Sequence, residues 1–142
     1  MLQLRDYRHP ADYAAARELW KGIERGVQLG RSDEPAEIGR KVQHDPDLFI
    51  VAESEGMIVG SSMGGFDGRR GLLYHLSVAG PYRKKGIGRQ LMREVEQRPH
   101  RRGCLKYYLL VTKDNPEALE FYRQEGRSEM DQVHLLGKEL RA

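Results

Sequence analysis

A glycine-rich turn between an apolar strand and an amphipathic helix limits the fold more than any other feature of this chain. The segment is LSVAGPYRKKGIGRQLM, residues 76–92. Its first three residues continue an apolar run, and Ala79-Gly80-Pro81 has the residue types of a turn. Apolar residues then recur at helical spacing, at Ile87, Leu91, Met92 and Val95. A strand that turns directly into such a helix favours a sheet covered by helices.

Hydrophobic pattern and turn residues predict the other elements. We expect strands at Met1–Arg5, Leu48–Ala52, Met57–Gly60, Leu72–Val78, Leu105–Thr112 and Gln132–Leu136. We expect helices at Pro10–Gly22, Glu34–Gln43, Gly86–Gln97 and Asn115–Glu125. The poorly periodic stretch Gly22–Glu34 is predicted to be a helix end and a mobile loop. Gly64-Gly65 and Asp67-Gly68 are expected to break or turn the strand that begins at Met57.

The order of these elements predicts one domain, residues 1–142, of the α/β (α+β) class. Hairpins in the first half give antiparallel strands. Strands and helices alternate in the second half, so at least one pair there is expected to be parallel, with a crossover helix between its strands. A mixed sheet with helices on both faces accommodates both patterns.

Composition excludes several classes of protein. The chain has 142 residues, 39% of them hydrophobic, and a net charge of +3 from 24 Lys and Arg against 21 Asp and Glu. No apolar run reaches the roughly 18 residues of a membrane span, and the N-terminus lacks the apolar stretch of a signal peptide. The single cysteine, Cys104, excludes an internal disulfide, and we interpret it as a buried small hydrophobe in a cytoplasmic protein. The five histidines show no metal-ligand spacing.

The turn itself predicts a site for an anion. Its glycines let the backbone approach a ligand closely, and the free N–H groups of the first helical turn carry the positive end of the helix dipole. Arg83-Lys84-Lys85 lies beside these N–H groups, and phosphate binds such sites readily. Neither the P-loop pattern nor the three-glycine dinucleotide pattern is present. The alternative is that the three cations are a solvated charge run at a helix start.

Two motifs resemble a known family. The pattern R-x-x-G-x-G at Arg83–Gly88, after a strand and before an amphipathic helix, resembles the signature of the GNAT superfamily of acyl-CoA N-acyltransferases. A strand followed by Asn115-Pro116-Glu117-Ala118, Phe121-Tyr122 and Gly126 resembles a second element of that family. Several segments between Leu48 and Lys138 also resemble bacterial YpeA-type acetyltransferases. The resemblance implies a mixed, mostly antiparallel sheet of six to seven strands, with helices on both faces and a splayed central strand pair.

The resemblance also implies where acetyl-CoA binds. The backbone of the strand end would pair with the pantetheine arm, the turn would hold the pyrophosphate, and the start of the next helix would contact the arm near its reactive end. The implied cofactor-binding residues are Leu76, Ser77, Val78, Arg83, Lys84, Lys85, Gly86, Ile87, Gly88, Arg89, Asn115 and Tyr122.

The resemblance implies one catalytic residue, Tyr122, and the residues themselves offer His75 as our candidate base. Tyr122 would be the general acid that protonates the departing thiolate. Leu110 stands where some family members carry a glutamate base, so the base must be sought elsewhere. His75 is a candidate because its ordinary pKa suits proton transfer near neutral pH; Tyr74, Asp67, Glu53 and a chain of water molecules are the other candidates. From pattern alone, Tyr122 would instead pack in the core, and His75 would face the sheet or solvent.

The implied activity is an N-acetyltransferase that moves an acetyl group from acetyl-CoA to a primary amine by direct attack in a ternary complex. The amine belongs to a small molecule or a protein, and no metal or membrane is expected to take part. One alternative is a non-catalytic acyl-CoA-binding sensor or interaction module of the same fold. A nucleic-acid-binding domain is disfavoured, because no recognition helix or stacking platform is visible. A homodimer formed through a sheet edge or the last strand stays open.

Overall fold

The sheet consists of five strands in the order β1-β2-β3-β4-β5. The computed structural model describes every residue except 24–26, 28 and 142. The strands are β1 (Leu2–Asp6), β2 (Phe49–Ser54), β3 (Met57–Phe66), β4 (Gly71–Val78) and β5 (Tyr107–Leu109). The first four pair antiparallel with their neighbours, and β4 pairs parallel with β5. The predicted parallel pair in the second half of the chain is therefore confirmed.

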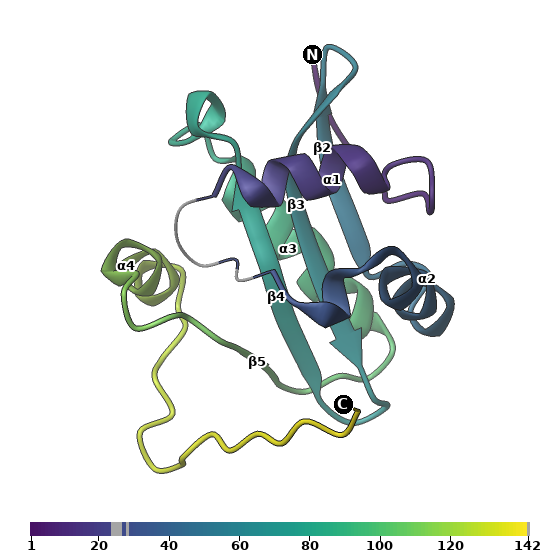
Figure 1. Ribbon diagram of the computed structural model, residues 1–142. Coiled ribbons are helices and arrows are strands. Elements are labelled where there is room, and N and C mark those ends of the chain that lie inside the picture. Colours follow the sequence, from purple (N-terminus) through teal and green to yellow (C-terminus); the bar gives the residue numbers. More distant parts are fainter. Residues whose placement is uncertain (24–26, 28, 142) are drawn as a thin grey trace.

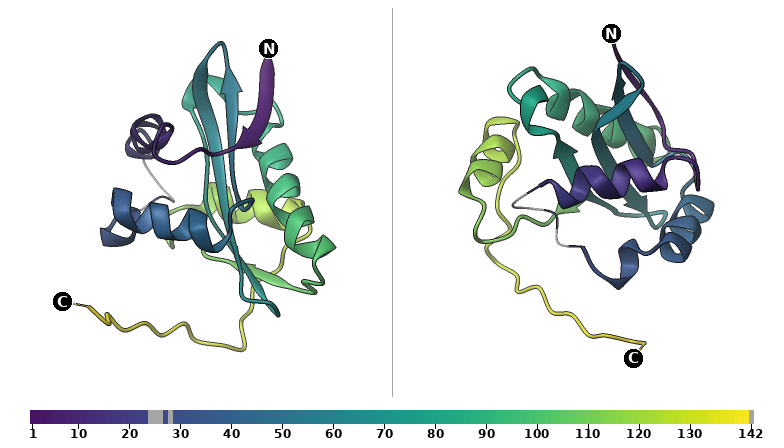
Figure 2. Two further views of the ribbon diagram at one scale, coloured as in Figure 1. Left: turned by 90° about the vertical axis from the view of Figure 1, so that its right-hand side faces the viewer. Right: turned by 45° about the horizontal axis from the view of Figure 1, so that its top comes forward.

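Helices cover both faces of the sheet, as predicted (Figures 1 and 2). Helices α1 (Tyr13–Lys21) and α2 (Pro35–His44) lie on one face, and the crossover helix α3 (Ile87–Arg101) lies on the other. Helix α4 (Pro116–Gln124) follows β5 and packs beside the start of α3. Two short 3₁₀ turns, η1 (Arg31–Asp33) and η2 (Gly80–Tyr82), precede α2 and α3. Within the described residues, no helix combines the length and apolarity needed to cross a bilayer.

Strand β2 shows why the run LFIVA contains no polar residue. Phe49 and Val51 belong to the apolar cluster under α1 and α2, whereas Ile50 and Ala52 belong to the cluster under α3. Successive side chains of a strand point to opposite faces, so a central strand with helices on both sides must be apolar at every position. The two clusters together form the core.

A bulge in β4 is the local feature that shapes the site. Ser61 pairs with Ser77 and Met63 with Tyr74, so one residue of β3 lies opposite two of β4, His75 and Leu76. His75 takes the left-handed backbone conformation, with φ of 54°, which is uncommon for a residue other than glycine. The extra residue breaks the alternation of side chains.

The broken alternation puts two consecutive side chains of β4 on one face. Leu73 and Leu76 pack in the cluster under α3. Tyr74 packs against the cluster under α1 and α2, and the ring of His75 lies edge-on to Trp20 of α1, with 4.8 Å between ring centroids. Tyr74 and His75 therefore share the face that α1 and α2 cover.

The pair β4–β5 is splayed, as the resemblance implied, but β5 is the edge strand of the sheet, so the splayed pair is not the central one. Only Gly71, Leu72 and Leu73 of β4 pair with β5, opposite Tyr107–Leu109. Within the described residues, no strand pairs with this side of β4 from Tyr74 to Val78. A stretch of strand edge is thus open between β4 and α4.

The strand count of six to seven is wrong, because the described residues form a sheet of five strands. The segment Gln132–Leu136 is not a strand; its residues are exposed, with Leu136 89% exposed. Its alternating apolar residues suit a strand, but β5 pairs over three residues only and gives no long edge to extend. The expected strand Leu105–Thr112 is shortened to Tyr107–Leu109, because its pairing with β4 ends at Leu73.

Two smaller expectations also change. Gly64 and Gly65 do not break β3, which continues through them to Phe66. Gly64 meets a packing requirement instead, because a Cβ there would lie 2.9 Å from Val95. The chain turns at Asp67 instead, whose carboxylate accepts the N–H groups of Arg69 and Arg70. In the predicted loop Gly22–Glu34, residues 24–26 and 28 lie outside the described part of the chain, and residues 31–33 form η1.

Candidate active site

The turn before α3 has the geometry of an anion-binding loop. Lys84 and Gly86 both take positive φ, 61° and 82°, which bends the backbone sharply in front of the helix. Gly86 is the N-cap and has no side chain to bond the first helical N–H groups. The N–H groups of Ile87, Gly88 and Arg89 belong to this first turn, where α-helices leave N–H groups without internal partners. A Cβ at Gly86 would meet nothing within 4 Å, so the space above it is open.

The cations of this turn divide into two groups. Within the described residues, no ion pair is recorded for Arg83, Lys84 or Lys85. The Arg83 Nε atom donates to the Val78 carbonyl at 3.0 Å, which ties the turn to the end of β4, and Lys85 lies over the Tyr82 ring. Arg89 differs, because its Nε atom donates to Glu125 at 3.0 Å and links α3 to the end of α4. The first group is available to an anion, whereas Arg89 would have to leave Glu125.

The open edge of β4 lies beside this turn. Leu76 and Val78 are half-buried and pack toward α3. Ser77 is buried, and its hydroxyl donates to the His75 carbonyl at 3.3 Å. The Ser61 hydroxyl donates to the same carbonyl at 3.1 Å. The hydroxyls of Ser61 and Ser77 therefore bond the His75 carbonyl, which the bulge takes out of the strand-to-strand hydrogen bonding. They hold the backbone in place where β4 diverges from β5.

Asn115, Tyr122 and Thr112 line one open groove between β5, α4 and the following segment, with a volume of about 1210 Å³. The Asn115 side-chain oxygen accepts the N–H of Ala118 at 3.2 Å, so Asn115 caps α4 and keeps its NH₂ group for another partner. Burial raises the pKa of Tyr122 to about 12, opposed by the nearby Arg127. The phenol is therefore protonated at neutral pH and able to donate.

The Thr112 hydroxyl has no recorded partner. It is the one buried side-chain oxygen or nitrogen in the described part of the chain that lacks a hydrogen bond. A buried unsatisfied hydroxyl costs roughly 1–3 kcal/mol. Its place in the groove with Asn115 and Tyr122 indicates that a ligand completes its hydrogen bonding.

His75 forms a close pair with Asp33. The Nε2 atom of His75 and the Oδ1 atom of Asp33 are 2.6 Å apart. Asp33 lies in η1 and is only 4% exposed. Asp33 belongs to the poorly periodic stretch between α1 and α2, so no sequence pattern marked it as a site residue, and it was not among the predicted site residues.

A second cleft, of about 830 Å³, lies between α2, η1 and the β3–β4 hairpin. Tyr74, His75 and Asp33 line it together with charged residues of α2. Burial raises the pKa of Tyr74 to about 12, with smaller contributions from Asp45 and Asp33. The Lys41 amino group contacts both Asp45 and the Gly64 carbonyl. The cleft therefore brings titratable groups of both signs to the face of β4 opposite α3.

The other candidate bases lie in different surroundings. Glu53 of β2 accepts a hydrogen bond from the Arg5 Nε atom at 2.6 Å, and β3 separates β2 from β4 in the sheet. Asp67 lines the same cleft as His75, but its carboxylate already accepts two N–H groups of its own turn. Cys104 is buried, as predicted. Within the described residues, no cluster of three or more His, Cys, Asp or Glu side chains has the arrangement of a metal site.

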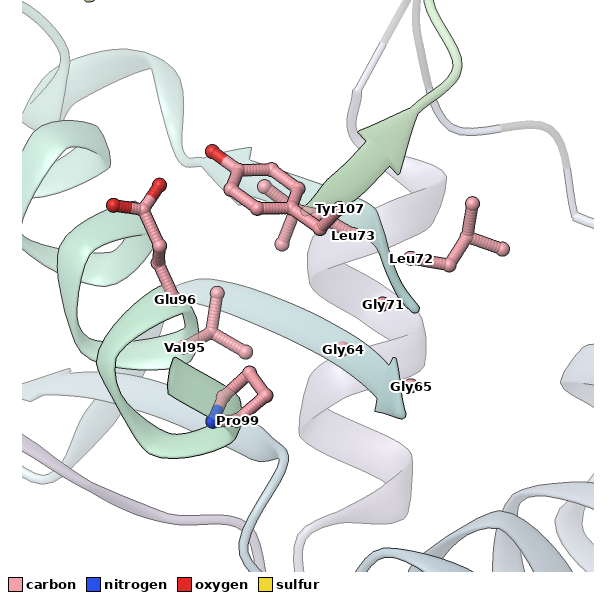
Figure 3. A pocket seen from close by; sticks show the side chains of 9 residues that line it. All are labelled: Gly64, Gly65, Gly71, Leu72, Leu73, Val95, Glu96, Pro99 and Tyr107. Atoms are coloured by element: carbon pink, nitrogen blue, oxygen red, sulfur yellow. The ribbon is translucent and has the colours of Figure 1, made fainter. Parts of the chain in front are cut away.

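A third cavity, shown in Figure 3, is too small for a substrate. It lies where Val95, Glu96 and Pro99 of α3 face Leu73 and Tyr107, and its volume is about 10 Å³. That is near the least space a single water molecule occupies. Beside it, Arg127 donates to the Tyr107 hydroxyl at 2.7 Å and pairs with Glu96.

Comparison with known proteins identifies the family. The model of the Acetyltransferase (GNAT) family matches residues 13–126. An acetyltransferase of Sodalis glossinidius is 40% identical over 139 residues, which cover 98% of this chain and 96% of that protein. An acetyltransferase of Pectobacterium atrosepticum is 38% identical over the same shares of the two chains. This chain belongs to the GNAT family of acetyltransferases.

Solved GNAT-like structures share the fold. An aminoglycoside N-acetyltransferase in complex with CoA superposes with a TM-score of 0.75 at 17% identity, covering 97% of this chain and 95% of that one. Ard1 from Thermoplasma volcanium superposes with a TM-score of 0.71 at 21% identity, covering 88% and 81%. At these identities the likeness concerns the fold alone.

Three features of this GNAT chain fit CoA. CoA has an anionic diphosphate and an extended arm with amide groups. The unpaired cations and free N–H groups of the turn suit the diphosphate. The open edge of β4 and the orphaned Thr112 hydroxyl suit the arm.

Proposed function

We propose that this protein transfers an acetyl group from acetyl-CoA to a primary amine by direct attack in a ternary complex. The observation that carries the proposal is the open edge of β4, which runs from Tyr74 to the turn with its unpaired cations. With the pantetheine arm of acetyl-CoA along this edge, the thioester would lie between two clefts, one lined by Tyr122 and the other by His75.

Different residues bind different parts of the CoA molecule. N–H groups from Lys84 to Arg89, with the charges of Arg83, Lys84 and Lys85, bind the diphosphate. Backbone groups of Leu76, Ser77 and Val78 bond the arm as a neighbouring strand would. Asn115 and Thr112 bond the arm from the α4 side. Bound acetyl-CoA supplies an activated acyl thioester.

Tyr122 and His75 move the protons. The new bond joins the amine nitrogen to the acetyl carbon, and the bond between that carbon and sulfur breaks. His75 receives the proton that the amine loses, and Tyr122 donates its phenolic proton to the departing sulfur. Exchange with solvent restores both side chains. Burial, which raises the pKa of Tyr122 to about 12, keeps this proton in place throughout the neutral range.

The test is thiol release from acetyl-CoA across a panel of amines, for the native protein and for Tyr122→Phe. We expect the variant to lose a factor of roughly 10² or more in turnover, because general acid catalysis typically contributes that much. CoA binding, measured by calorimetry, should stay within about twofold, because the phenylalanine ring fills the same space.

One result would count against the role of Tyr122, and another against the function itself. Equal turnover of Tyr122→Phe and the native protein would remove Tyr122 from the mechanism. Thiol release with no amine of the panel, despite CoA binding, would favour the alternative of a non-catalytic acyl-CoA sensor.

A further inference from the structure

Asp33 and His75 are brought together from distant parts of the chain. Asp33 lies in η1 and His75 in the bulge of β4, 42 residues later. Their side chains are 6% and 15% exposed, and the joined atoms are 2.6 Å apart. An ion pair on an exposed surface contributes little, but this pair lies against the cleft of about 830 Å³ that both residues line.

The Asp33 side chain is held in place by its own surroundings. The Gly30 N–H donates to Asp33 Oδ2 at 3.0 Å, and the Tyr13 hydroxyl of α1 donates to the Asp33 carbonyl at 2.6 Å. One carboxylate oxygen is thus engaged by the backbone and the other by His75. The carboxylate is fixed before any substrate arrives.

The His75 side is fixed as well. Its carbonyl accepts two serine hydroxyls, and its ring packs against Trp20, whose Nε1 atom donates to Ser61 at 3.0 Å. The positive φ of 54° at His75 is a strained conformation, which the surrounding hydrogen bonds maintain. Backbone strain of this kind is concentrated at functional sites.

The hydrogen bond decides which nitrogen of His75 carries a proton. Burial raises the pKa of Asp33, but the bonds from His75 and Gly30 outweigh it and leave the pKa below its ordinary value. Asp33 is therefore ionised at neutral pH and can only accept. A neutral His75 must then hold its proton on Nε2, which leaves Nδ1 with a free lone pair. Among the described residues, no partner is recorded for Nδ1.

We propose that Asp33 is a positioning residue for this transferase: it keeps His75 in the Nε2–H form, so that Nδ1 takes the proton of the acceptor amine. This inference rests on the proposed function. Asp33 also stabilises the imidazolium that forms when His75 takes the proton. Other charged or titratable groups around the cleft are Tyr74, Glu37, Arg40, Lys41, His44, Asp45, Asp67 and Arg70, and Arg17 of α1 lies close enough to Asp33 to affect its pKa.

The first measurement compares Asp33→Asn with a matched control, Asp12→Asn. Asp12 also forms a part-buried ion pair, with Arg5 at 2.7 Å, but it does not line the cleft. Both variants should lower the melting temperature. Only Asp33→Asn should lower kcat, by roughly 10- to 100-fold, because part of a general base's contribution of roughly 10²–10⁴ is lost. The KM for acetyl-CoA should change less than about twofold.

The second measurement tests whether Asp33 acts through His75. In a His75→Gln background, Asp33→Asn should cause no further loss of kcat, because coupled residues are not additive. Asp33→Glu, which keeps the carboxylate, should recover part of the activity that Asp33→Asn loses. The basic nitrogen itself can be observed by nitrogen-15 NMR of labelled histidine, assigned with His75→Gln. We expect the Nε2–H form in the native protein, a measurement that requires no Asp33 variant to fold.

The outcomes separate the two proposals. An Nδ1–H form in the native protein, or an unchanged kcat in Asp33→Asn, would overturn the role of Asp33 while native thiol release upholds the proposed function. Additive losses in the double variant would assign Asp33 a merely structural role. A native protein that releases no thiol with any amine would overturn the proposed function itself.

Discussion

At the scale of single residues, Thr112 carries the least expected feature, a buried hydroxyl without a hydrogen-bond partner in the part of the chain that the structure describes. The free protein bears the cost of this group, and a ligand that bonds it recovers that cost on binding. Sequence pattern places Thr112 at the end of a strand and gives no sign that its side chain is unsatisfied.

Thr112→Val should therefore weaken ligand binding without lowering the stability of the fold. We expect equal or higher resistance to urea, because valine has the same shape without the hydroxyl. CoA affinity should fall by about 0.5–1.5 kcal/mol, the usual net value of one hydrogen bond. Calorimetric titration with CoA measures the change, and Thr112→Ser serves as the control that keeps the hydroxyl. A valine variant that binds CoA as tightly as the native protein would remove Thr112 from the site.

At the scale of elements, Gly86 in the turn before α3 meets two structural requirements at once. Gly86 caps the helix with φ of 82° and leaves open space where a ligand would approach. Gly56, in the turn between β2 and β3, has a similar φ of 76° and equally open surroundings. The two positions have the same left-handed backbone conformation but lie at different places in the fold.

Gly86→Ala and Gly56→Ala form a matched pair. Both should lose roughly 1–2 kcal/mol of unfolding free energy, since an L-residue in the left-handed region costs about that much. Only Gly86→Ala should also weaken CoA binding, by about 1 kcal/mol or roughly fivefold, because it disturbs N–H groups at the helix start. Urea unfolding and CoA titration of both variants test this. Equal CoA affinities in the two variants would show that the turn at Gly86 does not contribute to CoA binding.

At the scale of the whole molecule, two carboxylates, one buried and one part-buried, join separate elements. Asp12 joins the start of α1 to Arg5 of β1, and Asp33 joins η1 to β4. Hydrogen bonds from Arg5 and Arg8 lower the pKa of Asp12 despite its burial, and the pKa of Asp33 is lowered in a similar way. A pKa that is lower in the folded chain means that the unfolded chain binds more protons in acid.

Stability should therefore be full above the ordinary carboxyl pKa of 3.8 and should fall as the pH drops through and below that value. Asp12→Asn should lower the free energy of unfolding at pH 6 and should flatten its decrease between pH 5 and pH 3. Urea unfolding across this range measures both effects. Asp131→Asn, at an exposed position, is the control. A decrease as steep in Asp12→Asn as in the native protein would contradict the assignment.

The sequence by itself determined most of the elements and the turn before α3. Local patterns located α1, α2, α3 and α4, the hairpin strands and the turn Arg83–Gly86, because spacing, caps and glycines act over a few residues. They did not locate the ends of β3 and α3, which continue to Phe66 and Arg101. The motifs around Arg83–Gly88 and Asn115–Tyr122 also predicted the family. The same local rules overestimated the C-terminal strand, since a suitable pattern does not supply a partner edge.

Only the tertiary structure decided the number of strands, the bulge at His75 and the pairing of that histidine with Asp33. Alternation along β4 predicts opposite faces for Tyr74 and His75, but the mismatch with β3 places both toward α1 and α2. Asp33 reaches His75 through the packing of η1 against the sheet. Both outcomes depend on contacts between residues far apart in the chain, and such contacts have no periodic signal in the sequence.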